Sequence, residues 1–247
     1  MKWIDSHIHV DQYKDEEKSR LLKEVENSKE IKGLIAVSMN YQSCKETLSL
    51  AKKYPFIYPA IGFHPEQQIH KEECEQIYQL IEQNAEEIVA IGEVGLPYYL
   101  RKEDERIAAD PYIAVLKKFI ELASKYNLPI VLHAVYEDAD IVCDLLEKYK
   151  VSRAHFHWFK GSDETMKRMM KNGYYISITP DVLQKEKNEV KMKDIHITTN
   201  KDGIHVEKPT SANDIIDYIK QYGFFLMLGF VIIVFLLLLK RAKKLES

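Results

Sequence analysis

Short apolar runs alternate with charged, amphipathic stretches along most of the chain. Eight of the runs have the length and composition of buried β-strands, and they span residues 2–10, 33–39, 57–63, 87–94, 129–135, 152–159, 174–179 and 194–199. Stretches of helix length lie between most of them, at residues 16–28, 41–53, 72–84, 111–126, 137–150 and 163–172. This alternation is typical of a parallel sheet covered by helices. Eight such units predict an α/β protein with a (β/α)8 TIM-like barrel rather than an open sheet. We expect the last unit to be divergent or incomplete and to be followed by a C-terminal hydrophobic helix.

Polar side chains stand where the predicted strands end, which is where a barrel of this kind carries its chemistry. His7 and His9 are two residues apart in the first strand, so their side chains point to the same face. The ends of later strands carry His64, Glu93, His133, His155 and His157. Imidazole nitrogens and carboxylate oxygens bind divalent cations, so the set favours a metal site. The alternative for His7 and His9 is a strand edge with two solvent-facing histidines.

Five short motifs occur in a fixed order, namely HIHVD at 7–11, GFHP at 62–65, GEVGL at 92–96, LPIVLH at 128–133 and HWFKG at 157–161. Together they resemble the TatD family of metal-dependent deoxyribonucleases, within the amidohydrolase superfamily. The resemblance covers residues 1–199 and implies a barrel with two divalent metal ions, which are Mg, Mn or Zn. It implies that His7 and His9 bind the first ion, that Glu93 bridges both, and that His133 and His157 bind the second.

The same resemblance implies hydrolysis of phosphodiester bonds at the ends of DNA, with a metal-activated water as the attacking group. DNA or a nucleotide is then the expected substrate partner. His64 would contact the substrate or its phosphate, and His155 would be a structural histidine. Tyr98 and Tyr99 either stack on a nucleobase or pack as part of a lid. Hydrolysis of an amide or a lactone stays open, because one fold hosts many chemistries.

The chain departs from the family motifs at two places. The family has a catalytic aspartate in a Glu-Thr-Asp segment, where this chain reads Thr198-Thr199-Asn200. Asn200 is a neutral amide that cannot take up a proton, so we expect reduced activity unless Asp202 acts as a substitute. Pro97 stands where the family often has an acidic residue, which changes the surroundings of the site without removing a ligand.

Composition narrows the class of protein further. The chain has 247 residues, a net charge of −3 and 46% hydrophobic residues, which describes a globular protein without a global field that would attract nucleic acid. Its three cysteines are widely spaced and read as reduced thiols of a cytosolic protein. Met1 leads directly into the first strand, so we expect no signal peptide.

The C-terminal segment differs in character from the rest. We divide the chain into a hydrolase barrel at 1–200, a linker with a short helix at 201–221, a transmembrane helix at 222–239 and a basic tail at 240–247. Residues 221–239 carry no charge and reach roughly 30 Å as a helix, the thickness of a bilayer core. We expect a cytoplasmic body anchored to a membrane by this helix. A gene rearrangement that joined the segment to a truncated family member is the alternative.

These observations leave two functional classes open. In the first, the chain is a metal-dependent hydrolase that acts on DNA. In the second, it is a catalytically impaired, membrane-tethered barrel that binds metal or a nucleotide without turnover, because Asn200 replaces the aspartate.

Overall fold

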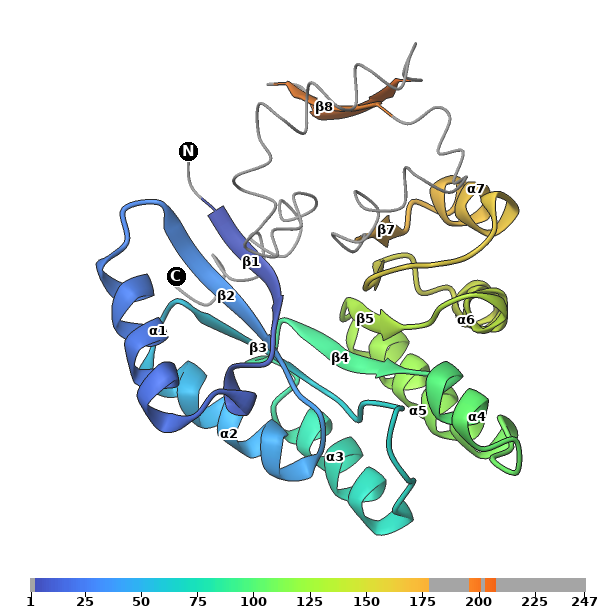
Figure 1. Cartoon of the computed structure of the whole chain (residues 1–247), viewed down its shortest axis with the longest axis horizontal. Coiled ribbons are helices and arrows are strands. Elements are labelled where there is room, and N and C mark those ends of the chain that lie inside the picture. The colour runs from blue at the N-terminus through green and yellow to red at the C-terminus, as the bar shows by residue number, and fades with distance from the viewer. Residues whose placement is uncertain (1–2, 178–195, 201–202, 208–247) are drawn as a thin grey trace. The chain divides into compact units, whose positions relative to one another are not determined.

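A parallel sheet of seven strands organises the protein (Figure 1). The computed structural model describes residues 3–177, 196–200 and 203–207. In the main sheet each strand pairs with the next one in the sequence, in the order β1 (Trp3–Ile8), β2 (Ile31–Val37), β3 (Ile57–Ile61), β4 (Ala90–Gly95), β5 (Ile130–His133), β6 (Ala154–Phe156) and β7 (Tyr175–Ile176). Because all seven strands run parallel, their carboxyl ends lie at one edge of the sheet. The sequential strand order is that of a barrel wall.

Helices follow the strands and lie along one side of the curled sheet (Figure 1). They are α1 (Asp15–Asn27), α2 (Tyr41–Lys53), α3 (Lys71–Gln83), α4 (Tyr98–Glu103), α5 (Asp110–Tyr126), α6 (Glu137–Lys148) and α7 (Asp163–Lys171), with a 3-10 turn η1 at Val10–Gln12. The six predicted helices are confirmed. The short α4 was not predicted, because its six residues lack a clear helical period.

Local capping explains where two of the helices begin. The Asn40 side chain accepts a hydrogen bond from the Ser43 backbone N–H at the start of α2, and Ser162 does the same for Thr165 at the start of α7. Each cap satisfies a backbone donor that has no partner inside the helix. The loops that precede α2 and α7 therefore end at defined residues.

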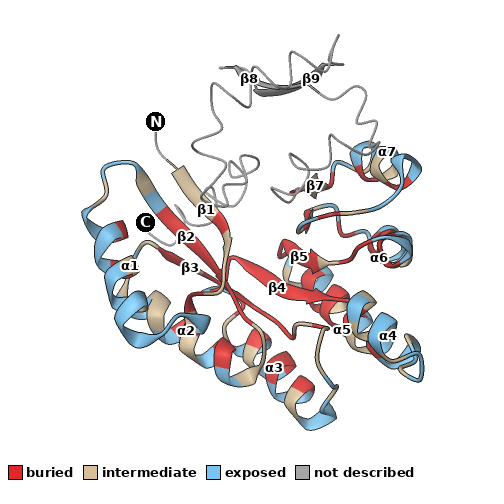
Figure 2. Cartoon of the chain, in the orientation of Figure 1, coloured by how far each residue is buried: buried red, intermediate tan, exposed pale blue. Residues whose placement is uncertain are grey.

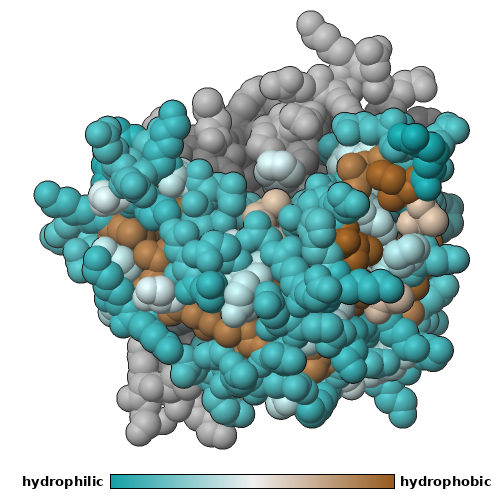
Figure 3. Space-filling model, turned by 90° about the horizontal axis from the view of Figure 1, so that it is seen from below, coloured by the Kyte–Doolittle hydropathy of each residue, from teal (hydrophilic) through white to brown (hydrophobic). Residues whose placement is uncertain are grey.

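The core lies between the sheet and the inner faces of the helices (Figure 2). Side chains of α3 and α5 such as Ile77 and Phe119 belong to one buried cluster with Ile91 of β4 and Leu132 of β5. The outer helix faces are polar, and the space-filling view shows mainly hydrophilic residues with hydrophobic ones in separate small groups (Figure 3). Burial on both sides explains why β2 to β5 read as continuous apolar runs.

Two strands lose their regular register where they carry predicted site residues. The β1–β2 register shifts between Asp5 and Ile8, around His7, and the β4–β5 register shifts between Ile91 and Val94, around Glu93. Such irregularities redirect side chains and are common next to active sites. At the end of β4, Gly95 pairs with His133, and a Cβ on Gly95 would lie 1.8 Å from the His133 carbonyl oxygen. Glycine is therefore required for this close approach of β4 and β5.

The strand predicted at 194–199 is present from residue 196, and it departs from the parallel pairing of a regular barrel unit. Residues 196–199 lie in β8 (His196–Asn200), which pairs antiparallel with β9 (Gly203–Glu207) in a separate two-stranded sheet. The sequence GIHVE of β9 alternates in polarity, and the Asp-Gly step at its start is typical of a hairpin.

The predicted transmembrane helix at 222–239 and the basic tail at 240–247 lie outside the described residues. Within the part that is described, no helix has both the length and the apolar character needed to cross a membrane. The boundaries placed after residue 200 stay predictions.

Candidate metal centre

Glu93, at the end of β4, lies at the centre of a group of histidines. Its carboxylate is buried, and its Oε2 lies 3.0 Å from His7 Nε2 and 3.4 Å from His9 Nε2. His64 Nε2 is 3.7 Å from the same oxygen, and His133 Nδ1 is 3.2 Å from Oε1. His7 lies in β1 and His133 is the last residue of β5, whereas His9 and His64 follow β1 and β3. Strands far apart in the sequence therefore meet at one carboxylate. The convergence predicted from the strand ends is present in the structure.

Two sets of three side chains have the spacing of a cation site. His7, His9 and Glu93 form one set, and His64, Glu93 and His133 form the other, with the ligand atoms of each set within 4.8 Å of one another. The buried Nε2 of His7 faces Glu93 and has no hydrogen-bond partner in the described part of the chain. Buried polar atoms are normally satisfied, so this nitrogen fits a bound cation. The donors are imidazoles and a carboxylate, a combination suited to Zn²⁺ or Mn²⁺.

His157 lies beside this cluster in a different way from the other histidines. Its ring stacks on His7, with centroids 3.4 Å apart and planes 2° apart, and its Nδ1 lies 3.2 Å from the Ser177 hydroxyl. It belongs to neither set of three, whereas His64, expected to contact substrate, belongs to one. His155 is 6.0 Å from His157, centroid to centroid, and belongs to neither set as well.

Burial and neighbouring charge act in opposite directions on Glu93. Burial alone would raise the pKa of its carboxyl, but His7, His133 and His9 outweigh burial and hold the pKa well below its usual range. The group is therefore an anion. Burial lowers the pKa of His64 to about 4, so this ring is neutral at physiological pH. Its Nδ1 accepts a hydrogen bond from the Glu66 backbone N–H over 3.3 Å, and its Nε2 faces Glu93.

Glu66 is a site residue that the sequence interpretation quoted without giving it a role. Its Oε1 lies 3.1 Å from His133 Nε2, and its carboxylate accepts hydrogen bonds from the backbone N–H groups of Tyr99 (3.0 Å) and Leu100 (2.7 Å). Burial would lower the pKa of His133, but Glu66 and Glu93 raise it to about 9. The signal available in the sequence was an acidic residue two positions after His64 in a loop at the carboxyl end of β3.

A buried ion pair anchors α4, the helix whose backbone N–H groups contact Glu66. Arg101 of α4 pairs with Asp138 of α6, whose side chain is fully buried. Tyr98 packs on Tyr136, 4.6 Å between centroids, and Tyr99 lies 6.2 Å from His133. Tyr99 therefore lies next to the cluster, and Tyr98 packs between Tyr99 and Tyr136. Pro97 precedes α4 as its N-cap residue.

Of the two predicted catalytic positions, Asn200 lies among the described residues and Asp202 does not. Asn200 ends β8 and pairs with Gly203, and Asp202 lies outside the described residues. Their roles stay predictions.

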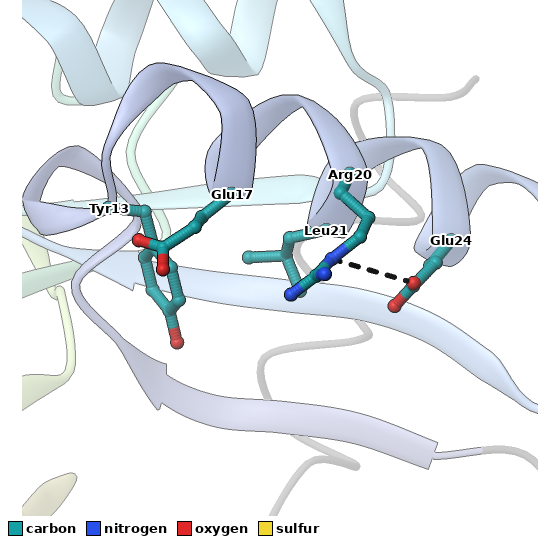
Figure 4. Close-up of a pocket in the computed structure, with 5 residues that line it drawn as sticks. All are labelled: Tyr13, Glu17, Arg20, Leu21 and Glu24. Atoms are coloured by element: carbon teal, nitrogen blue, oxygen red, sulfur yellow. Dashed lines mark ion pairs between the residues drawn. The ribbon is translucent and has the colours of Figure 1, made fainter.

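A separate hollow lies on α1 and contains no histidine (Figure 4). It is lined by Tyr13, Glu17, Arg20, Leu21 and Glu24, and Arg20 forms an ion pair of 4.0 Å with Glu24. Ion pairs this exposed contribute little, and none of the five residues belongs to the two cation sets.

Comparison with known proteins identifies relatives of the whole described body. The family model of TatD related DNase matches residues 4–207. An uncharacterized metal-dependent hydrolase of Haemophilus influenzae is 40% identical over 83% of this chain and 80% of its own length. The deoxyribonuclease TATDN3 of Homo sapiens is 23% identical over 79% of this chain and 74% of its own length. The crystal structure of the TatD homologue YjjV from Escherichia coli K12 superposes with a TM-score of 0.61 and 26% identity, over 70% of this chain and 66% of that one.

Proposed function

The chain belongs to the TatD-related DNase family, and we propose that it uses divalent metal ions to hydrolyse phosphodiester bonds of DNA. The observation that carries the proposal is the position of Glu93, whose two oxygens lie 3.0–3.7 Å from nitrogens of four histidines. Relatives described as metal-dependent hydrolases and as a deoxyribonuclease support it.

We propose that His7, His9 and Glu93 would hold a first cation and that Glu93 and His133 would contribute to holding a second. The remaining nitrogen of the second site comes from His64, which the geometry favours, or from His157, which the family motif favours. The variants His64→Ala and His157→Ala distinguish these assignments by metal content, since only the loss of a ligand lowers it. Bound divalent cations would lower the pKa of a water and neutralise charge on a phosphate.

The side chains around the cations have separate tasks. Glu93 remains ionised, so it can hold two positive charges in a site with little water. His64 is neutral, so near a phosphate it acts as a ligand or a hydrogen-bonding group rather than as a cationic clamp. Glu66 holds the far nitrogen of His133, which fixes the direction of the nitrogen that faces Glu93.

The test uses the purified full chain, Mn²⁺ or Mg²⁺ and an end-labelled DNA oligonucleotide. We expect release of labelled product that requires added metal, stops with a chelator and falls at least 100-fold in Glu93→Gln. The exposed variant Glu75→Gln serves as the control and should cleave at the wild-type rate. Hydrolysis of an amide or lactone substrate, with no release from DNA at any metal concentration, would contradict the proposal.

A second candidate rests on Asn200, whose amide cannot accept a proton. In that case the protein binds metal and nucleotide with little turnover. Metal-dependent binding of the oligonucleotide without cleavage would support this candidate instead.

A further inference from the structure

Trp158 is an exposed aromatic residue that continues a stack of rings from the metal cluster toward solvent. It follows His157 directly, and its side chain is 51% exposed. The indole stacks on the His157 ring with centroids 4.9 Å apart and planes 22° apart, and His157 stacks on His7 in turn. One face of the indole is therefore covered by a ring of the cluster.

The backbone of Trp158 has a conformation that bulky residues rarely adopt. Its φ is +49°, in the left-handed region. The Trp158 N–H donates to the Ser177 hydroxyl over 2.9 Å, and the Phe159 N–H donates to the Ser177 carbonyl over 2.8 Å. The same hydroxyl lies 3.2 Å from His157 Nδ1. The strained conformation is thus held by contacts from just beyond β7, and strain of this kind is concentrated at functional sites.

The other residues with positive φ make the position of Trp158 more informative. Asn127 and Lys150 follow the helices α5 and α6, where a polar residue in this conformation is a common way to end a helix. Tyr136 and Trp158 follow β5 and β6 instead, at the edge of the sheet that carries the histidines, and both are exposed aromatics. Among the described non-glycine residues with positive φ, the polar ones therefore follow helices and the aromatic ones lie beside the site.

We propose that Trp158 is a stacking platform for a nucleobase next to the phosphodiester that lies at the Glu93 cluster. This inference rests on the proposed function. Every nucleobase has a flat π-face, so an indole face beside a phosphate site binds a base without selecting its identity. A base in a duplex already has stacking partners on both sides, so the platform favours bases that are unpaired or at a strand end.

Fluorescence tests the platform without turnover. The chain has two tryptophans, so Trp3→Phe leaves Trp158 as the single indole fluorophore. The probes are a phosphorothioate-linked oligothymidylate and the same backbone without bases, each added with Mn²⁺. We expect quenching by the oligothymidylate and none by the abasic backbone. Equal quenching by both probes, or none by either, overturns the proposal.

Kinetics with a matched pair of variants provide the second readout. Trp158→Phe keeps a flat ring, whereas Trp158→Leu keeps apolar bulk without one. We expect KM for an oligonucleotide to rise roughly tenfold in the leucine variant and much less in the phenylalanine variant. Mn²⁺ affinity is measured for both, because Trp158 contacts His157. Equal KM values in the two variants, with unchanged Mn²⁺ affinity, contradict the platform.

These outcomes separate the inference from the function on which it rests. Metal-dependent cleavage by the wild type, with equal KM in both Trp158 variants and no base-dependent quenching, rejects the platform alone. Base-dependent quenching without any cleavage of DNA keeps the platform as a binding site and rejects the hydrolase. A protein that neither cleaves DNA nor shows quenching rejects both.

Discussion

The imidazole rings of His7 and His157 lie face to face, 3.4 Å apart and within 2° of parallel. His7 belongs to the first strand of the main sheet, and His157 follows the sixth. Two strands that are not neighbours in the sheet can bring their side chains into contact only if the sheet curls. The contact between His7 and His157 therefore shows that the sheet is curved. This curvature allows the Glu93 carboxylate to contact histidines from several strands.

Metal binding should stabilise the folded protein, because a cation that binds only the folded state shifts the unfolding equilibrium. At a free metal concentration 100 times Kd the gain is about 2.7 kcal/mol, which raises Tm by roughly 5–10 °C for a chain of this size. Thermal unfolding with Mn²⁺ and with a chelator measures the shift. His9→Ala should remove most of it, and the exposed His70→Ala should keep it. An equal shift in both variants would place the metal elsewhere.

Removing the charge on Glu66 should weaken metal binding without unfolding the protein. Glu66→Gln keeps the shape of the side chain but makes it a weaker partner for His133 Nε2. The loss of such a supporting contact typically lowers metal affinity 10–100-fold. Calorimetric titration with Mn²⁺ measures the change, and Glu82→Gln, at an exposed ion pair with Lys125, is the control. Unchanged affinity in Glu66→Gln would show that His133 needs no such support.

Breaking the ion pair between Arg101 and Asp138 should destabilise the protein in a pH-dependent way. Arg101→Ala leaves a fully buried carboxylate without its partner, at a cost of about 3 kcal/mol near neutral pH. Burial raises the pKa of Asp138 above 3.8 although Arg101 opposes it, so the folded protein binds this proton more tightly than the unfolded chain. Stability from this group is therefore lost as pH rises above that value.

The loss of Arg101 should raise the pKa of Asp138 further, because the positive charge that lowers it is gone. We expect the stability difference between Arg101→Ala and wild type to shrink as pH falls toward about 4. Urea unfolding across this pH range measures it. A difference that stays constant with pH would mean that removing Arg101 leaves the pKa of Asp138 in the folded protein unchanged.

A methyl group on Gly95 should disturb the metal centre through the backbone. In Gly95→Ala the Cβ would meet the His133 carbonyl, so β4 and β5 must separate and His133 must shift. Overpacking of this kind costs about 1–3 kcal/mol, and we expect a loss of metal affinity as well. Gly173→Ala is the matched control, because its φ of +70° makes alanine unfavourable while nothing lies within 4 Å of the added carbon. It should lower Tm and leave metal affinity unchanged.

Restoring a carboxylate at position 200 tests the assignment of the last family motif. If Asn200 stands in place of the catalytic aspartate, Asn200→Asp should raise the rate of DNA cleavage tenfold or more, which is about 1.4 kcal/mol of barrier. Single-turnover cleavage of a labelled strand measures the rate, and Asn200→Ala is the comparison. The same rate in all three proteins would show that residue 200 has no part in the reaction.

The sequence was informative where several strand ends carried metal-binding side chain types. The spacing of His7 and His9, and the position of Glu93 at the end of a buried strand, predicted side chains that the structure brings within a few Å of one another. The family resemblance is confirmed by the match over residues 4–207.

The parts that the sequence did not predict depend on contacts between distant residues. The role of Glu66 arises from a loop that folds back on His133 and on α4, and no local pattern encodes that distance. The pairing of residues 196–200 was misread because an apolar alternation fits a barrel strand and a hairpin equally well. The distinguishing signal was the Asp-Gly step that follows.

The contact between His7 and His157 also has a consequence for how the protein is made. Synthesis proceeds from the N-terminus, so His7 and His9 leave the ribosome long before the ring that covers His7 exists. A nascent chain that ends before residue 157 carries the first histidine pair and Glu93 without the face that shields them. Metal capture by the finished architecture is therefore a late event in biogenesis, and a prematurely terminated polypeptide would present its imidazoles to solvent.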